Sequence, residues 1–252
     1  MRVIVTRPRP QAMQWVQWLA ARGIDALALP LIDIAEPADV AAVERAWSRL
    51  DSQRLVVFVS PNAAEQFFRL RPADAAWPAD VTAASIGPGT TQTLQRLGLP
   101  AAAIVEPARD ALQFDSEALW ARLRGRDWSG TSVLIVRGDG GREWLADTLR
   151  EHGAQVNFVA AYRRSEPQIT GDALASLNEA VARPHEHLWF FSSSEAIDHL
   201  AQACPAHDWA RSRALATHPR IAQRARDCGF EDVRETRPTL EAVIACIQSI
   251  AS

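Results

Sequence analysis

Short apolar runs rich in valine, isoleucine and phenylalanine alternate with longer stretches in which apolar residues recur every three or four positions. A run such as 55–59 (LVVFV) is apolar throughout, as in a strand covered by helices on both faces. Strands are predicted at 2–6, 26–29, 55–59, 82–86, 102–105, 132–136, 156–159, 187–191, 214–217 and 231–234. Helices are predicted, for example, at 9–22, 62–71, 88–97, 140–152, 195–203, 219–228 and 239–250. This alternation predicts an α/β fold with parallel sheets.

Parts of the pattern occur twice at nearly the same spacing, which indicates a duplicated α/β unit of about 130 residues. The matching pairs are 3–7 with 134–137, 58–68 with 190–200, and 86–98 with 217–229, at offsets of 130, 132 and 131 residues. Two domain divisions fit the repeat. The chain could divide near residue 128, or it could leave one domain near 33 and return near 167, because Pro30, Pro37 and 162–167 (YRRSEP) are typical of connectors.

All 27 basic residues among the 252 are arginine, and the sequence contains no lysine. This excludes Schiff-base enzymes, which need a reactive lysine. It also excludes Walker-type nucleotide hydrolases and kinases that use the usual lysines. The net charge of −3 and the pI of about 6.1 do not favour a nucleic-acid-binding protein.

The three cysteines are widely spaced and form no CxxC motif, which suits a reducing compartment and favours a cytoplasmic protein. The N-terminal MRVIVTRPRP lacks the apolar stretch of a signal peptide. No stretch approaches the ~18 apolar residues of a membrane span.

The residues after the predicted strands are mostly small, hydroxylated, glycine, proline or arginine. Ligands of doubly wound sheets bind beyond the carboxyl ends of the strands, where helix N-termini favour anions. Any one of these loops taken singly is more often only a helix cap or a turn, but six loops of the same character suit a ligand with several carboxylates or phosphates. The loops are 6–8, 60–62, 87–90, 137–142, 192–194 and 218–220.

The common catalytic motifs are absent. Residues 87–89 (GPG) and 138–141 (GDGG) do not complete a GxGxxG pattern, and no HExxH or GxSxG occurs. Tyr162 is the only tyrosine, and we predict that it lies in the connector rather than in a core strand. Its neutral phenol can donate a hydrogen bond without a counter-charge. The alternative interpretation is an amphipathic plug between domains.

Taken together, these landmarks resemble the uroporphyrinogen-III synthase family. The resemblance rests on an ordered set of motifs that spans nearly the whole chain. They are VTRP (5–8), FVSPNA (58–63), SIGPGTTQTL (85–94), VLIVRGDGGREWLADTLREHGAQV (133–156), AYRRSEP (161–167), FFSSS (190–194) and THPRIA (217–222).

The resemblance implies two similar α/β domains, each a five-stranded parallel sheet flanked by helices, joined by a two-stranded β connector. Domain 1 would be discontinuous, from residues 1–33 and 168–252, and domain 2 would span 38–161. Residues 34–37 and 162–167 would form the connector, and the active site would lie in the cleft between the domains.

The resemblance also implies that the protein cyclises hydroxymethylbilane to uroporphyrinogen III, inverting the last pyrrole ring through a spiro intermediate and releasing water. No cofactor or metal would be needed, the protein would be a cytoplasmic monomer, and hydroxymethylbilane synthase could hand over the substrate. Tyr162 would be catalytic, as the donor to the leaving oxygen. The substrate-binding residues would be Thr6, Arg7, Ser60, Asn62, Gly87, Thr90, Arg137, Gly138, Arg142, Ser193 and His218.

Two other functions are compatible with parts of the pattern. A non-catalytic two-domain protein that binds a small anion and closes about a hinge would share the cleft and the duplication. A nucleotide-dependent enzyme would use the loop at 138–141, but no ribose-binding acid follows at 159–163.

Overall fold

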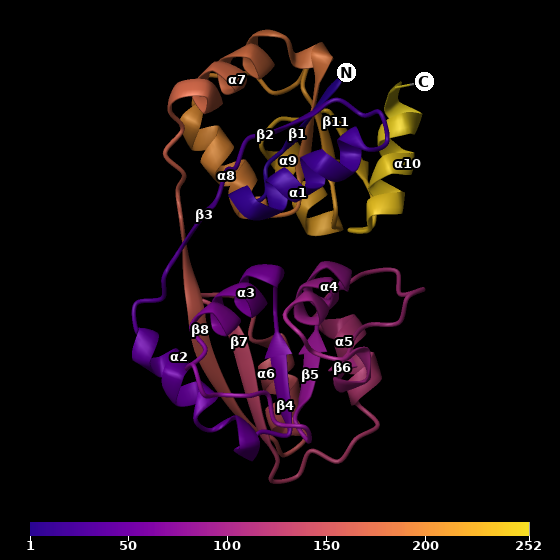
Figure 1. Cartoon of the computed structure of the whole chain (residues 1–252). Helices are drawn as coiled ribbons and strands as arrows, with labels where there is room; N and C mark the ends of the chain where they lie inside the picture. The colour runs from indigo at the N-terminus through magenta and orange to yellow at the C-terminus, as the bar shows by residue number, and fades with distance from the viewer. Residues whose placement is uncertain (252) are drawn as a thin grey trace. The chain divides into compact units, whose positions relative to one another are not determined.

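The computed structural model describes residues 1–251 of the chain, which contain eleven strands and ten α-helices (Figure 1). The strands are β1 (Arg2–Val5), β2 (Ala26–Ala28), β3 (Asp33–Ala35), β4 (Leu55–Phe58), β5 (Thr82–Ser85), β6 (Ile104–Val105), β7 (Ser132–Gly138), β8 (Gln155–Ser165), β9 (His187–Phe191), β10 (Arg213–Ala216) and β11 (Asp232–Glu235). The α-helices are α1 (Arg9–Ala20), α2 (Val40–Trp47), α3 (Pro61–Arg69), α4 (Pro88–Arg96), α5 (Ser116–Leu123), α6 (Trp144–Glu151), α7 (Gly171–Ala182), α8 (Ser194–Ala203), α9 (Pro219–Asp227) and α10 (Leu240–Ala251). Each of the ten predicted strands overlaps an observed one.

The chain divides into two compact units. Unit 1 contains Met1–Asp33 and the segment from Ser165 to the C-terminus, and unit 2 contains Ile34–Arg164. The sheet of unit 1 has the order β11-β10-β9-β1-β2, and that of unit 2 has the order β3-β8-β7-β4-β5-β6. A division near residue 128 does not fit this topology, because β4 and β7 pair directly within one sheet.

The α/β prediction is confirmed, with one correction to the number of strands. Within the described residues, unit 2 has six strands rather than five, because β3 is hydrogen-bonded to the edge of β8. The predicted β connector is therefore part of a sheet. In addition, β8 runs to Ser165, beyond the predicted end at 159. Residues 160–165 escaped prediction because only Ala161 and Tyr162 among them are buried, so no continuous apolar run marks this part of the strand.

The repeat in the sequence corresponds to a repeat in topology. Strands β2-β1-β9-β10-β11 occupy the same successive positions in unit 1 as β8-β7-β4-β5-β6 in unit 2. All the pairings among these ten strands are parallel. The matching segments of the sequence fall on β1 and β7, on the ends of β4 and β9 with the helices that follow, and on α4 and α9 directly after β5 and β10. Both units are thus built on one scaffold.

Helices cover both faces of the unit 2 sheet. Val56 and Phe58 face a core that includes side chains of α2, α3 and α4. Leu55 and Val57, on the opposite face, pack with α5 and α6. Burial on both faces explains why β4 is apolar throughout. In unit 1 the matching face of β1 and β9 packs against α1 and α10.

Two local features depart from the predicted elements. The helix predicted from residue 140 begins at Trp144, because Gly140 and Gly141 precede it and Gly141 has a φ of 142°, outside the helical region. The three cysteines are free thiols in unit 1, and burial raises the pKa of each. No helix within residues 1–251 is long and apolar enough to cross a membrane.

Candidate active site

The order of strands in unit 2 places a ligand-binding position between β4 and β7. From β4 the chain proceeds outward through β5 and β6, and from β7 it proceeds outward in the other direction through β8. Such a reversal leaves a crevice beyond the carboxyl ends of the two central strands, where doubly wound proteins bind ligands. Ser60 follows β4, and Gly138 ends β7.

Tyr162 lies at this position, and its ring is part of the core of unit 2. The residue has no exposed surface, and the phenol oxygen lies 3.1 Å from Ser60 Oγ. Arg164 Nη2 donates a hydrogen bond of 3.2 Å to the same oxygen. The prediction that Tyr162 lies outside a core strand is therefore wrong. Residues 160–165 extend β8, and a register irregularity opposite Arg137 and Gly138 leaves both Ala161 and Tyr162 buried and pairs Tyr162 with Gly138.

Gly138 allows the Tyr162 ring to reach Ser60. Gly138 on β7 and Tyr162 on β8 are paired across the two strands, at a register irregularity between Arg137 and Gly138. A Cβ atom at Gly138 would lie 3.1 Å from both Cε2 and Cζ of Tyr162. Because real Cβ contacts are rarely this close, the ring occupies the space that any larger residue would fill.

Ser60 caps helix α3. Its Oγ accepts a hydrogen bond of 3.0 Å from the backbone N–H of Ala63, which satisfies one of the free donors of the first turn. Pro61 begins the helix, where a missing N–H costs nothing, and Asn62 follows in the same turn. Ser60 is partly exposed, so this hydroxyl connects the buried phenol with the surface of the unit.

The next strand end carries Gly87 and Thr90 at the start of α4. Gly87 is the N-cap residue and offers no side chain to the helix, and a Cβ there would lie 3.3 Å from Cβ of Phe114. Thr90 is buried, and its N–H bonds to the carbonyl oxygen of Gly87. Beside them, Thr91 Oγ1 donates a hydrogen bond of 2.6 Å to Glu106, a contact that the sequence did not reveal.

Arg137 and Arg142 already contact carboxylates within unit 2. Arg137 Nη2 lies 3.2 Å from Glu143 Oε1, and its guanidinium carbon lies 3.9 Å from the centre of the Phe158 ring. Its Nη1 is buried and has no hydrogen-bond partner in the described part of the chain. Arg142 pairs with Glu117 through both of its terminal nitrogens, at the surface.

Unit 1 has an arginine at the position equivalent to Arg137. Arg7 follows β1, and its guanidinium lies 5.1 Å from the Trp15 ring centre and 5.7 Å from that of Phe190. Its Nε is buried without a hydrogen-bond partner among residues 1–251. Burial lowers the pKa of Arg7 to about 10, so the group remains charged at neutral pH. The position equivalent to Glu143 is Met13, which leaves this cation without the carboxylate that Arg137 has.

The other predicted residues of unit 1 also lie at strand ends. Thr6 is buried, and its Oγ1 donates a hydrogen bond of 2.8 Å to the carbonyl oxygen of Phe190 on β9. Ser193 is the N-cap residue of α8 and makes no side-chain bond to that helix. His218 caps α9, where its Nδ1 accepts a hydrogen bond of 3.1 Å from the N–H of Arg220. Thr6, Arg7 and Ser193 thus border the junction of β1 and β9, and His218 lies at the adjacent strand.

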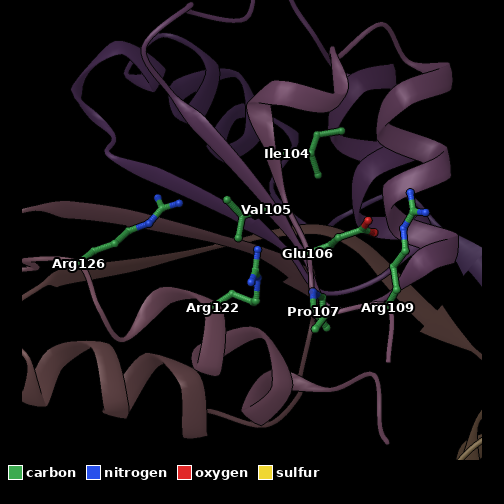
Figure 2. Close-up of a pocket in the computed structure, with 8 residues that line it drawn as sticks. Ile104, Val105, Glu106, Pro107, Arg109, Arg122 and Arg126 are labelled. Carbon is green, nitrogen blue, oxygen red and sulfur yellow. The ribbon is translucent and has the colours of Figure 1, made fainter. Parts of the chain in front are cut away.

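A separate cavity of about 480 Å³ lies at the far edge of the unit 2 sheet. Figure 2 shows Arg109, Arg122 and Arg126 around it, with Glu106 beside β6. Strands β5 and β6 separate this cavity from β4. It is therefore distinct from the cluster of Ser60, Gly138 and Tyr162.

Arg164 is the residue at the candidate site that the sequence analysis missed. It lies two residues after Tyr162, and residues i and i+2 of a strand share a face. This spacing would have placed it beside the phenol if the strand had been predicted to continue beyond 159.

Comparison with known proteins identifies the family. A model of the family described as uroporphyrinogen-III synthase HemD matches residues 13–245. A uroporphyrinogen-III synthase of Salmonella typhimurium is 28% identical over 242 residues, covering 93% of this chain and 94% of the relative. One from Proteus mirabilis is 31% identical over 165 residues, covering 65% of this chain and 80% of the relative.

Solved structures share the fold at lower identity. The uroporphyrinogen-III synthetase of Helicobacter pylori has a TM-score of 0.60 at 17% identity, covering 99% of this chain and 100% of that one. A mutant synthase of Thermus thermophilus has a TM-score of 0.59 at 17% identity, covering 100% and 97%. Because the family model matches most of its length, the chain belongs to the uroporphyrinogen-III synthase family.

Proposed function

We propose that Tyr162 supplies the proton in the reaction of this family. The chain is a lyase that cyclises hydroxymethylbilane to uroporphyrinogen III, in tetrapyrrole biosynthesis. The reaction inverts the last pyrrole ring and releases water. The observation that carries the assignment is the cluster of Ser60, Tyr162 and Arg164 at the reversal point of the unit 2 sheet.

The chemistry requires a donor at the leaving hydroxyl. Hydroxide is a poor leaving group, and protonation of its oxygen in the transition state allows it to depart as water. The substrate that remains is cationic, so a donor that is neutral before the step avoids placing a second positive charge against it. The phenol of Tyr162 meets this condition, and the Arg164 guanidinium beside it offsets the negative charge that develops on its oxygen.

The enzyme must also hold the linear substrate in the geometry that leads to inversion of its last ring. Closure without inversion is available to the free substrate, so the protein must favour attack at the substituted carbon by positioning. We propose that Arg7 and Arg137 contact carboxylates of the substrate. Each lies over an aromatic ring and has a buried N–H group that a carboxylate oxygen would satisfy. The other proposed contacts are Thr6, Ser60, Asn62, Gly87, Thr90, Gly138, Arg142, Ser193 and His218.

A coupled assay tests this function. The purified protein is supplied with hydroxymethylbilane by the enzyme that generates it, and the product isomers are separated. We expect the type III isomer from the native chain, and the type I isomer alone would contradict the assignment. Tyr162→Phe should lower kcat at least about 10-fold, because a general acid contributes roughly 10²–10⁴-fold. Its circular dichroism spectrum should match that of the native chain, and an unchanged kcat would remove Tyr162 from the mechanism.

We infer that the protein acts as a cytoplasmic monomer and receives its substrate by transient contact with hydroxymethylbilane synthase. Spontaneous closure of the free substrate supports such a transfer, because rapid capture limits the loss to the wrong isomer. Light scattering of the purified chain measures its mass. In the coupled assay, dilution of both enzymes at a fixed ratio should raise the share of type I isomer.

A further inference from the structure

The phenol of Tyr162 has one route by which its proton can leave. The residue has no exposed surface, so solvent does not reach it in the described structure. Its oxygen has two side-chain contacts, with Ser60 Oγ at 3.1 Å and with Arg164 Nη2 at 3.2 Å. A guanidinium has five N–H donors and no acceptor. The acceptor for the phenol hydrogen is therefore the Ser60 hydroxyl.

The bonds of Ser60 define the direction of the chain of hydrogen bonds. Its oxygen has two lone pairs and one hydrogen. One lone pair accepts the N–H of Ala63 at 3.0 Å, and the other accepts the hydrogen of Tyr162. The Ser60 hydrogen is then left to point away from both, and the residue is partly exposed. The hydrogen bonds therefore run in one direction, from Arg164 to Tyr162 and from Tyr162 to Ser60. The series ends at the Ser60 O–H group, which is open to a ligand.

We propose that Ser60 delivers the proton to the leaving hydroxyl and that Tyr162 replaces it, an inference that rests on the proposed function. As the carbon–oxygen bond of the substrate breaks, the leaving oxygen takes the Ser60 hydrogen and departs as water. Ser60 takes the phenol hydrogen, and the phenolate remains beside the Arg164 guanidinium. After ring closure, the proton released by the new macrocycle returns through Ser60 to Tyr162. The net change is loss of one water.

The duplicated unit shows that the scaffold does not require this arrangement. The positions of unit 1 that correspond to Gly138 and Tyr162 by the 130-residue offset are Pro8 and Ile32. Both are buried, and neither side chain can donate or accept a proton. Unit 1 thus has an arginine and helix N-termini at its strand ends, but it has no counterpart of the hydrogen-bonded series formed by Arg164, Tyr162 and Ser60. Within the described residues, the arrangement of Arg164, Tyr162 and Ser60 belongs to unit 2.

The test must separate the proposed role of Ser60 from its role as a helix cap. Ser60→Thr keeps both the cap and the hydroxyl, and Ser60→Asn keeps a cap without a hydroxyl. Ser60→Ala removes both. Asp39→Ala is the matched control, because Asp39 caps α2 in the same unit through Ala42, away from the site. Turnover is measured in a single-turnover coupled assay, with thermal unfolding of each variant.

We expect Ser60→Thr to retain turnover within about threefold, and Ser60→Asn to lose at least about 10-fold while keeping its unfolding temperature. Asp39→Ala should lose stability and keep turnover. The dependence of the rate on the deuterium fraction of the solvent should be curved for the native chain, since two protons move, and linear for Ser60→Asn. Native turnover in Ser60→Asn would overturn the relay. So would a Ser60→Thr variant as slow as Ser60→Ala, if it unfolds at the native temperature. Failure of the proposed function is a separate result, namely type I isomer alone from the native chain.

Discussion

Gly138 determines the position of the Tyr162 phenol. The ring lies against the Cα of this glycine, where a Cβ would be 3.1 Å from two ring carbons. The glycine is not needed for a left-handed backbone, because it is not among the residues with positive φ. Its role is to leave space, so that the side chain of a strand residue can cross β7 and meet the residue that follows β4.

Substitution of Gly138 by alanine should displace the ring and separate the phenol from Ser60. We expect kcat to fall about 10-fold, and overpacking to cost about 1–3 kcal/mol of unfolding free energy. Gly140→Ala is the control, because a Cβ there meets no atom within 4 Å. Turnover and urea unfolding of both variants check this prediction. Equal turnover in the two variants would contradict it.

Arg7 combines a cost to stability with a proposed role in binding. Its folded pKa of about 10 lies below the ordinary value of arginine, because burial penalises the charged form. The folded state therefore bears this penalty at every pH below about 10 and loses it only as the pH rises from there toward the ordinary pKa of arginine. Since part of the side chain remains exposed, the penalty at neutral pH is only a fraction of the full desolvation cost.

Arg7→Met should therefore raise the unfolding free energy at pH 7 by about 1 kcal/mol and raise KM several-fold. Arg22→Met, at an exposed arginine of the same unit, should change the unfolding free energy by less than about 0.5 kcal/mol and leave KM unchanged. Urea unfolding and steady-state kinetics provide the two measurements. A destabilised Arg7→Met variant with native KM would show that the arginine is structural.

At the scale of elements, the start of α6 controls the charge at the end of β7. Glu143 precedes α6, and its carboxylate lies 3.2 Å from Arg137 Nη2. The carboxylate is half exposed, whereas 17% of the Arg137 side chain is exposed. A substrate carboxylate at Arg137 would compete with this internal partner. The pair thus holds the arginine in place and weakens its attraction for a second anion.

Glu143→Gln should remove that competition and lower KM about two- to fivefold, with kcat unchanged. The unfolding free energy should change by less than about 1 kcal/mol, as is usual for partly exposed ion pairs. Asp147→Asn is the matched control, because it removes the same charge from the same helix, where the carboxylate pairs with Arg150. Steady-state kinetics at low salt check the result. A higher KM in Glu143→Gln would mean that Arg137 needs Glu143 to bind substrate.

The sequence predicted elements well wherever both faces of a strand are covered. All ten predicted strands are observed, because runs such as Leu55–Phe58 have no polar interruption. It missed one short edge strand and the outer end of a long one. Strand β3 has only three residues and begins with an exposed aspartate, and four of the last six residues of β8 are exposed. Tyr162 was chosen from the sequence, but its contact with Arg164 depends on the unpredicted end of β8.

At the scale of the molecule, duplication has produced two units with one topology and different chemistry. Both place an arginine beside an aromatic ring at the carboxyl end of the equivalent strands β1 and β7. Unit 2 alone has the glycine and tyrosine that create a proton donor between strands. We infer that anion binding is a property of the shared scaffold, because both units have helix N-termini and arginines at their strand ends. The proton donor, in contrast, requires particular residues on that scaffold.

Because each unit has its own sheet and core, and unit 2 is continuous in sequence, the segment 33–165 should fold without the rest of the chain. It contains the whole six-stranded sheet and both core clusters of unit 2. It also contains Trp47, Trp77 and Trp128, so urea unfolding of the segment is measurable by fluorescence. We expect a single cooperative transition coincident with that of the circular dichroism signal.

The variant Phe67→Ala tests whether the unfolding transition of the segment reports on its native core. Phe67 is fully buried, and its ring centre lies 4.8 Å from that of Trp47. Phe67→Ala should destabilise the segment by about 3–5 kcal/mol and shift its midpoint to lower urea. In the full chain the three thiols report on unit 1, so their labelling at rising urea should be insensitive to Phe67→Ala. A segment without a cooperative transition, or a thiol labelling profile that shifts with Phe67→Ala, would show that the two units fold only as one body.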